Sequence, residues 1–187
     1  MAPNDLRNGR AALARRLRAW FVAPPKLTLS VAESLTCGRL QAAIGSASGA
    51  SEYFLGGMTA YTIGEKVRHL GVNRDEAVRC EAVSAAIAAQ MAAGSCRLFG
   101  SDLAVATTGF AEPKPGRGFA VPAAFFAIAQ RRGERCEIVR EGFFEGSGLS
   151  RIEMQEAVTA RALGALEDVV RGLRPPRNGR PEVSGGA

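Results

Sequence analysis

Strands and helices alternate along most of this chain, and some strands run directly into turns of small polar residues. Residues 26–32, K-L-T-L-S-V-A, alternate apolar and polar side chains and include branched residues, a pattern that predicts a strand. Residues 102–107, D-L-A-V-A-T, predict a buried strand. This alternation constrains the chain to an α/β domain built in layers. Further strands are predicted at 56–63, 122–130 and 136–144, and helices at 38–47, 65–70, 83–99 and 151–173.

The two ends of the chain differ from this pattern. Residues 6–21 predict an amphipathic helix, which Pro24-Pro25 ends. Residues 174–187 are rich in proline and glycine, a composition typical of a disordered tail. The chain has 187 residues, enough for one domain with its own core, and we assign that domain to residues 1–173. The apolar face of the first helix comprises Leu6, Leu13, Leu17, Trp20 and Phe21.

The charge balance is basic, with a net charge of +6. Such a balance suits nucleic acid, but it equally suits a phosphorylated small substrate. Much of the positive charge lies near the two ends of the chain, and no recognised nucleic-acid-binding motif accompanies it. Nucleic-acid binding is therefore the least supported function class.

Composition also bears on location and cofactors. No apolar run approaches the roughly 20 residues that span a bilayer, and the first residues lack the pattern of a secretory signal, so we expect a cytoplasmic protein without a membrane partner. The four cysteines are scattered without C-x-x-C spacing, and His69 is the single histidine. This argues against a zinc site, and we predict no metal or cofactor. The sequence leaves open whether the chain forms a homo-oligomer.

The turn after the strand at 26–32 carries a candidate nucleophile. Residues 32–38 read A-E-S-L-T-C-G and place the hydroxyl of Ser34 between a strand and a helix. A serine hydroxyl is a weak nucleophile until a nearby base takes its proton, and a desolvated lysine can be that base. Residues 61–66, Y-T-I-G-E-K, supply Lys66, so the pattern indicates a hydrolase of the serine–lysine type. Two simpler interpretations stay open: Ser34 as a helix cap, and Lys66 as a solvated lysine.

A second turn of small residues, Thr108-Gly109, follows the buried strand at 102–107. In α/β folds, ligand sites lie beyond the carboxyl ends of strands, where helix amino termini point. The Ser34 turn and the Thr108-Gly109 turn both fall at such places, so we expect them to belong to one site. Glycine permits a close backbone approach to a ligand, although an ordinary strand-ending turn explains the pair as well.

Residues 31–72 also carry an ordered set of motifs. After A-E-S-L-T-C-G, the motifs are Gly49-Ala50-Ser51, Gly57 and Tyr61 in G-M-T-A-Y, Lys66, and Leu70-Gly71-Val72. In these motifs the chain resembles the carboxyl-terminal domain of CinA-like proteins, the competence-damage family that includes nicotinamide-nucleotide (NMN) amidohydrolases. The resemblance implies an α/β/α sandwich around a central mixed sheet. It also implies a metal-independent amidohydrolase that converts nicotinamide mononucleotide, a small nucleotide, to nicotinate mononucleotide and ammonia, a step of pyridine-nucleotide recycling.

The resemblance assigns catalytic roles to three residues. Ser34 falls on the family's serine nucleophile, and Lys66, at the family spacing, falls on the general base. Tyr61 matches a tyrosine that relays a proton or positions the base, although a cross-strand aromatic contact would explain it too. Cys37 lies in the same motif and is a less favoured alternative nucleophile.

The remaining matches concern substrate binding. Backbone N–H groups of Thr36, Cys37 and Gly38 are candidates to stabilise an oxyanion, and Thr36 is also a candidate helix cap. Glu33 also matches the family motif, which implies that it either orients the turn or binds substrate. Arg151 aligns with a family arginine and suits a phosphate. Thr108 and Gly109 align with a Thr/Ser-Gly pair of the family.

Residues 110–124 depart from the family pattern. Glu112 stands where the family has a glycine, Ala124 stands near the place of a later glycine, and Ile63 replaces an asparagine. If this loop lines the pocket, the Glu112 carboxylate opposes a phosphate by like charge. Two alternatives therefore stand beside the NMN amidase: a diverged nucleotide-binding or regulatory module with little amidase activity, and an amidase for a different substrate.

Overall fold

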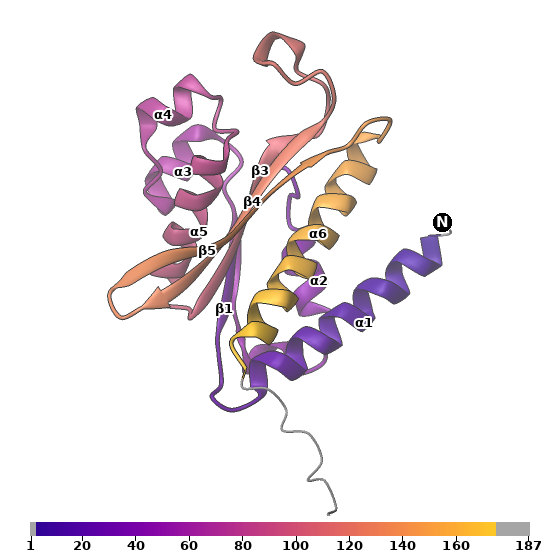
Figure 1. Ribbon diagram of the computed structural model, residues 1–187, viewed down its shortest axis with the longest axis vertical. Coiled ribbons are helices and arrows are strands. Elements are labelled where there is room, and N and C mark those ends of the chain that lie inside the picture. The colour runs from indigo at the N-terminus through magenta and orange to yellow at the C-terminus, as the bar shows by residue number, and fades with distance from the viewer. Residues whose placement is uncertain (1–2, 175–187) are drawn as a thin grey trace, which may run out of the picture.

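The computed structural model describes residues 3–174, with side chains from residue 12 onward (Figure 1). Five strands form a sheet in the order β2-β1-β3-β4-β5. β1 (Leu29–Glu33) lies between β2 (Phe54–Thr59) and β3 (Leu103–Phe110) and is parallel to both. β4 (Ala123–Arg132) and β5 (Arg135–Glu145) continue the sheet in antiparallel pairing. The carboxyl ends of β1 and β3 therefore meet at one edge.

Helices cover both faces of this mixed sheet, which confirms the predicted α/β/α sandwich (Figure 1). One face carries α1 (Pro3–Val22), α2 (Arg39–Gly45) and α6 (Arg151–Gly172). The other carries α3 (Ile63–Leu70), α4 (Arg74–Arg79) and α5 (Ala85–Phe99). Two short 3₁₀ turns, η1 (Ala50–Glu52) and η2 (Pro115–Arg117), lie in the connections.

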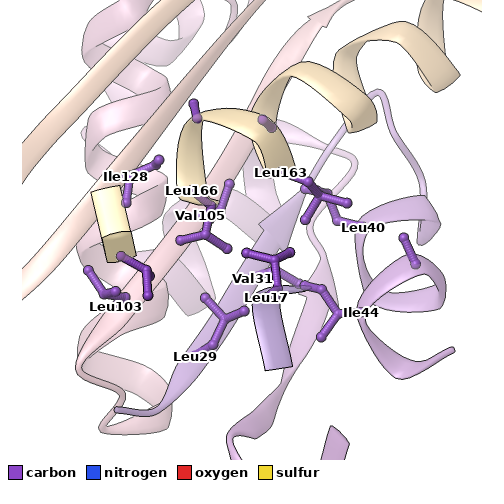
Figure 2. Packing of buried hydrophobic residues seen from close by; sticks show 14 of the residues in the cluster. Leu17, Leu29, Val31, Leu40, Ile44, Leu103, Val105, Ile128, Leu163 and Leu166 are labelled. Carbon is purple, nitrogen blue, oxygen red and sulfur yellow. The ribbon is translucent and has the colours of Figure 1, made fainter. Parts of the chain in front are cut away.

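The two faces of the sheet are packed with side chains of different size. Along β3, Leu103 and Val105 enter the core under α1, α2 and α6, where leucine, valine and isoleucine side chains interdigitate (Figure 2). The alternate positions, Ala104 and Ala106, face α5. Small side chains let a helix approach the sheet closely. The approach of α5 to α3 is equally tight, because a Cβ added to Gly94 would lie 2.1 Å from the backbone oxygen of Leu70.

Several predicted boundaries are wrong. The strand predicted at 56–63 is β2, which ends at Thr59, because Thr62 already caps α3 by accepting a hydrogen bond from the Glu65 N–H at 3.3 Å. The helix predicted at 65–70 accordingly begins at Ile63. α4 was not predicted, since its six residues are too few to show a helical period.

The ends of the chain fit the prediction in part. The predicted amphipathic helix is α1, and Leu17 and Phe21 are fully buried, whereas the side chain of Leu6 lies outside the described residues. The predicted disordered tail lies outside the described residues except for Arg174. That arginine contacts α1 and the segment after it, because its guanidinium donates hydrogen bonds to the carbonyl oxygens of Trp20 and Pro25.

Candidate active site

An open pocket of about 300 Å³ lies beyond the carboxyl ends of β1 and β3. This volume is at the lower end of the range, roughly 300–1,000 Å³, of small-molecule sites in proteins. The pocket joins the Ser34 turn to the Thr108-Gly109 turn, as expected from the order of strands and helices. Its lining residues are Ser34, Leu35, Tyr61, Lys66, Glu81, Val83, Thr108, Gly109, Phe110, Ala111, Glu112, Lys114 and Arg151.

The turn that presents Ser34 is anchored from within by Glu33. The Glu33 carboxylate is fully buried and accepts a hydrogen bond from the Thr36 hydroxyl at 2.7 Å. It also accepts hydrogen bonds from the N–H groups of Gly38 and Leu40, each at 3.0 Å, and from the backbone and side-chain nitrogens of Gln41. A carboxylate at the N-terminus of α2 satisfies N–H groups that the helix leaves unpaired. Glu33 therefore orients the turn, and its burial removes it from contact with a ligand.

Replacing Glu33 with glutamine is expected to lower the free energy of unfolding by about 3 kcal/mol, because the amide turns two N–H donors toward groups that are themselves donors. The side-chain volume is almost unchanged, so the loss comes from hydrogen bonding and charge. Urea unfolding followed by circular dichroism measures it. Glu141→Gln, at an exposed position, is the matched control and is expected to change stability by less than about 0.5 kcal/mol. A loss below 1 kcal/mol for Glu33→Gln would contradict the anchoring role.

Other residues of the turn do not face the pocket as predicted. The N–H of Cys37 donates to the Ser34 carbonyl at 3.2 Å, and the N–H of Gly38 donates to Glu33, so neither amide is available to an oxyanion. Thr36 is fully buried, and its hydroxyl bonds to Glu33 and to Thr107 rather than to a ligand. Within the described part of the chain, the N–H groups of Leu35 and Thr36 carry no hydrogen bond. Of these two residues only Leu35 lines the pocket, so its N–H is the remaining candidate oxyanion donor of the turn.

Lys66 contacts Ser34 in the lining of the pocket. Its Nζ lies 2.9 Å from the Ser34 Oγ and 3.1 Å from the Tyr61 carbonyl oxygen. The two side chains come from α3 and the end of β1, and Lys66 is only 2% exposed. No carboxylate among the described residues forms an ion pair with Lys66. Burial without a counter-ion disfavours the ammonium and lowers the pKa of Lys66 to about 8.

This lowered pKa gives Lys66 the protonation behaviour of a general base near neutral pH. The ammonium form donates to the Ser34 Oγ, whereas the neutral amine accepts the hydroxyl proton. Any reaction that needs the neutral amine is therefore expected to accelerate about tenfold per pH unit below pH 8 and to level off above it. The pH profile of kcat/KM measures this. A profile that is flat from pH 6 to 9 would contradict a basic role for Lys66.

Tyr61 and Arg151 lie at the mouth of the pocket. Tyr61 follows β2 rather than lying within it, so it is not the cross-strand contact that was one interpretation. Its hydroxyl accepts a hydrogen bond from the Arg151 Nη2 at 2.8 Å. Arg151 opens α6, where a positive charge opposes the helix dipole. Its position is thus not explained by helix stability.

Thr108 and Gly109 lie in the pocket wall, but their contacts are internal. The Thr108 hydroxyl donates to the Ala82 carbonyl at 2.6 Å, which ties β3 to the segment between α4 and α5. A Cβ added to Gly109 would lie 2.5 Å from the Ala123 carbonyl oxygen. The backbone of Gly109 therefore approaches β4 closely, whereas the sequence predicted a close approach to a ligand.

Sequence reasoning missed two charged residues of the pocket. Glu81 lies between α4 and α5 with a left-handed backbone, φ 50°, and its carboxylate bonds to Arg117 at 2.6 Å. Lys114 lies in the loop after β3, over the Phe110 ring. Neither stands in a motif, and both reach the pocket only through the packing of connecting segments. No three His, Cys, Asp or Glu side chains in the described part group so that they could hold a metal ion, and none of its helices has the length and apolarity to cross a membrane.

Fold and site together define a three-layer α/β domain with a buried serine–lysine pair at the end of a parallel strand. The family model described as the CinA C-terminal domain matches residues 12–170. The chain belongs to this family.

Curated relatives and solved structures agree with the family match. A CinA-like protein from Chlorobium limicola is 34% identical over 158 residues, which cover 82% of this chain and 37% of that protein. A CinA-like protein from Picosynechococcus sp. is 49% identical over 87 residues, covering 46% of this chain and 21% of that protein. The chain therefore spans well under half the length of these relatives.

The similarity to solved structures extends over most of the chain. The crystal structure of a CinA superfamily protein from Enterobacter cloacae has a TM-score of 0.76 at 26% identity, covering 86% of this chain and 92% of that one. A competence/damage inducible protein from Agrobacterium tumefaciens has a TM-score of 0.76 at 27% identity, with 87% and 95% covered. These matches confirm the predicted family and fold.

Proposed function

We propose that this chain is an amidohydrolase of the serine–lysine type that deamidates nicotinamide mononucleotide. The observation that carries the proposal is the 2.9 Å contact between the Lys66 Nζ and the Ser34 Oγ, made by a buried lysine whose pKa burial lowers to about 8. A solvated lysine or a simple helix cap would not need this arrangement. Helix capping at α2 is done by Glu33 instead, which leaves the Ser34 hydroxyl free for chemistry.

In the acylation step, the neutral Lys66 amine takes the Ser34 proton while Oγ attacks the carboxamide carbon. The carbonyl oxygen becomes an oxyanion, for which the N–H group of Leu35, a residue of the pocket lining, is the proposed donor. Lys66 then gives its proton to the amide nitrogen, the C–N bond breaks and ammonia leaves. The Tyr61 carbonyl helps to hold the Lys66 Nζ in place throughout.

In the deacylation step, Lys66 accepts a proton from water, whose oxygen attacks the acyl carbon. The bond between that carbon and the Ser34 Oγ breaks, and Lys66 returns the proton to Oγ. The product is the carboxylic acid, here nicotinate mononucleotide. One residue thus serves as base and then acid in both steps, as in other activated-nucleophile enzymes.

The pocket supports a substrate that carries an anionic group away from the amide. Arg151 and Lys114 both line the pocket, and an arginine fork is suited to a phosphate. The pocket volume, about 300 Å³, is also in the range of small-molecule sites. Nicotinamide mononucleotide has both required parts, a carboxamide and a phosphate.

The test is to incubate the purified protein with nicotinamide mononucleotide and to quantify ammonia and nicotinate mononucleotide. Equal amounts of the two products are expected. If neither forms while the nucleotide binds, the chain is a nucleotide-binding module and the amidase proposal fails. That second candidate function is favoured by Glu112, which places a carboxylate in the pocket next to Arg151.

A further inference from the structure

Glu112 places a negative charge in the pocket, next to Arg151. Its Oε2 lies 3.4 Å from the Arg151 Nη1, so the guanidinium that would receive an anion already has a carboxylate partner. The other carboxylate of the pocket, Glu81, is paired with Arg117, which does not line the pocket. Of the two acidic residues, only Glu112 therefore competes for a cation inside the pocket.

The pair between Glu112 and Arg151 is solvent-exposed, with side chains 67% and 45% accessible. Exposed ion pairs are weak, so an incoming anion can displace the carboxylate. The displaced carboxylate nevertheless stays close to the anion. For a phosphate dianion about 6 Å away in a water-like dielectric, this repulsion corresponds to roughly a tenfold weaker binding. An uncharged group at the same place suffers no such repulsion.

We propose that Glu112 is a specificity residue that lowers the preference of this site for amides bearing a phosphate over otherwise identical amides without one. It does so by occupying Arg151 and by repelling the anion that takes its place. With Glu112 present, the pocket discriminates less strongly against a nucleoside-type amide, whose hydroxyls face Arg151. Without Glu112, its preference for the nucleotide-type amide would be larger. The kinetic form of this proposal rests on the proposed amidase activity, whereas its binding form does not.

The kinetic test compares nicotinamide mononucleotide with nicotinamide riboside, which lacks only the phosphate. In Glu112→Gln, the ratio of kcat/KM for the nucleotide over the nucleoside is expected to rise about tenfold, through a lower KM for the nucleotide and with kcat unchanged. Glu141→Gln is the matched control, because it removes the same charge from an exposed position that does not line the pocket. A ratio that stays within twofold in Glu112→Gln, or that rises equally in Glu141→Gln, overturns the proposal.

The binding test uses inorganic phosphate and needs no turnover. Isothermal titration at pH 7.5 and low ionic strength is expected to show about tenfold tighter phosphate binding by Glu112→Gln than by the unsubstituted protein. In an Arg151→Ala background the same substitution is expected to give less than half of that gain. Equal affinities, no phosphate binding by either protein, or a full gain without Arg151 would each overturn the proposal. If the amidase assay fails but phosphate binding shifts as expected, only the proposed function is lost.

Discussion

Ser34→Ala is expected to reduce ammonia release from nicotinamide mononucleotide by at least about 10³-fold, because removal of an activated nucleophile ends covalent catalysis and leaves only substrate binding and oxyanion stabilisation. The loss falls on kcat, since Ser34 contributes little binding surface. The Lys66 amine remains buried without the hydroxyl that it contacts. Initial rates of ammonia formation, measured for both proteins at pH 8.5 where Lys66 is largely neutral, provide the comparison.

Ser48→Ala is the matched control for that experiment. Ser48 is an exposed serine a short way along the chain, after α2, and does not line the pocket. Its replacement is expected to leave kcat within twofold of the unsubstituted value. If Ser34→Ala keeps more than a tenth of the activity, then Ser34 is not the nucleophile and another group performs the attack.

Lys66→Met is expected to abolish ammonia release and, at the same time, to stabilise the fold by about 2 kcal/mol at pH 7. One pKa unit is worth about 1.4 kcal/mol, so a pKa lowered from 10.5 to about 8 sets an upper bound of about 3 kcal/mol on the cost of keeping the ammonium buried. Methionine fills a similar volume without a charge. The lost hydrogen bonds to Ser34 and Tyr61 offset part of the gain.

The pH dependence of stability isolates this effect. Because the pKa of Lys66 is lower in the folded than in the unfolded chain, the unfolded chain binds more protons between pH 8 and 10.5. The free energy of unfolding contributed by this group therefore rises across that window, and the cost of the buried charge is fully present below pH 8. Urea unfolding at pH 7, 9 and 10.5 is expected to show this rise in the unsubstituted protein and its loss in Lys66→Met.

An exposed lysine gives the matched control. Lys26→Met removes the same charge at an exposed position, and it is expected to change the free energy of unfolding by less than about 0.5 kcal/mol at pH 7. Lys66→Met that destabilises the fold at every pH would mean that Lys66 is held in its charged form by interactions worth more than its burial costs. The general-base role would then lose its physical basis.

The sheet and the main helices were predictable because their signals are local. The strand at 102–107 shows an apolar run of the right length, and the helix at 83–99 has clear capping residues, so both appear close to where they were predicted. β2 and α4 were harder. The carboxyl end of β2 depends on whether Thr62 caps a helix or continues a strand, and six residues of α4 carry too little periodicity to decide.

The site, too, was predictable only in part. Ser34, Lys66, Tyr61 and Arg151 were predicted by motif and lie together in the pocket. The same motif could not separate residues that face the pocket from those that build its floor, because Ser34 and Glu33 are neighbours on one strand end and point in opposite directions.

The tight contact between α5 and α3 has a consequence for how this site tolerates substitution. Gly94 leaves α5 no spare room against Leu70, the last residue of the helix that carries Lys66. A larger side chain at position 94 would push α3 and α5 apart. Because Lys66 lies on α3 and its Nζ contacts the Ser34 Oγ at 2.9 Å, such a movement would change that distance. The position of the proposed catalytic lysine thus depends on a glycine of another helix, which contacts α3 at its last residue.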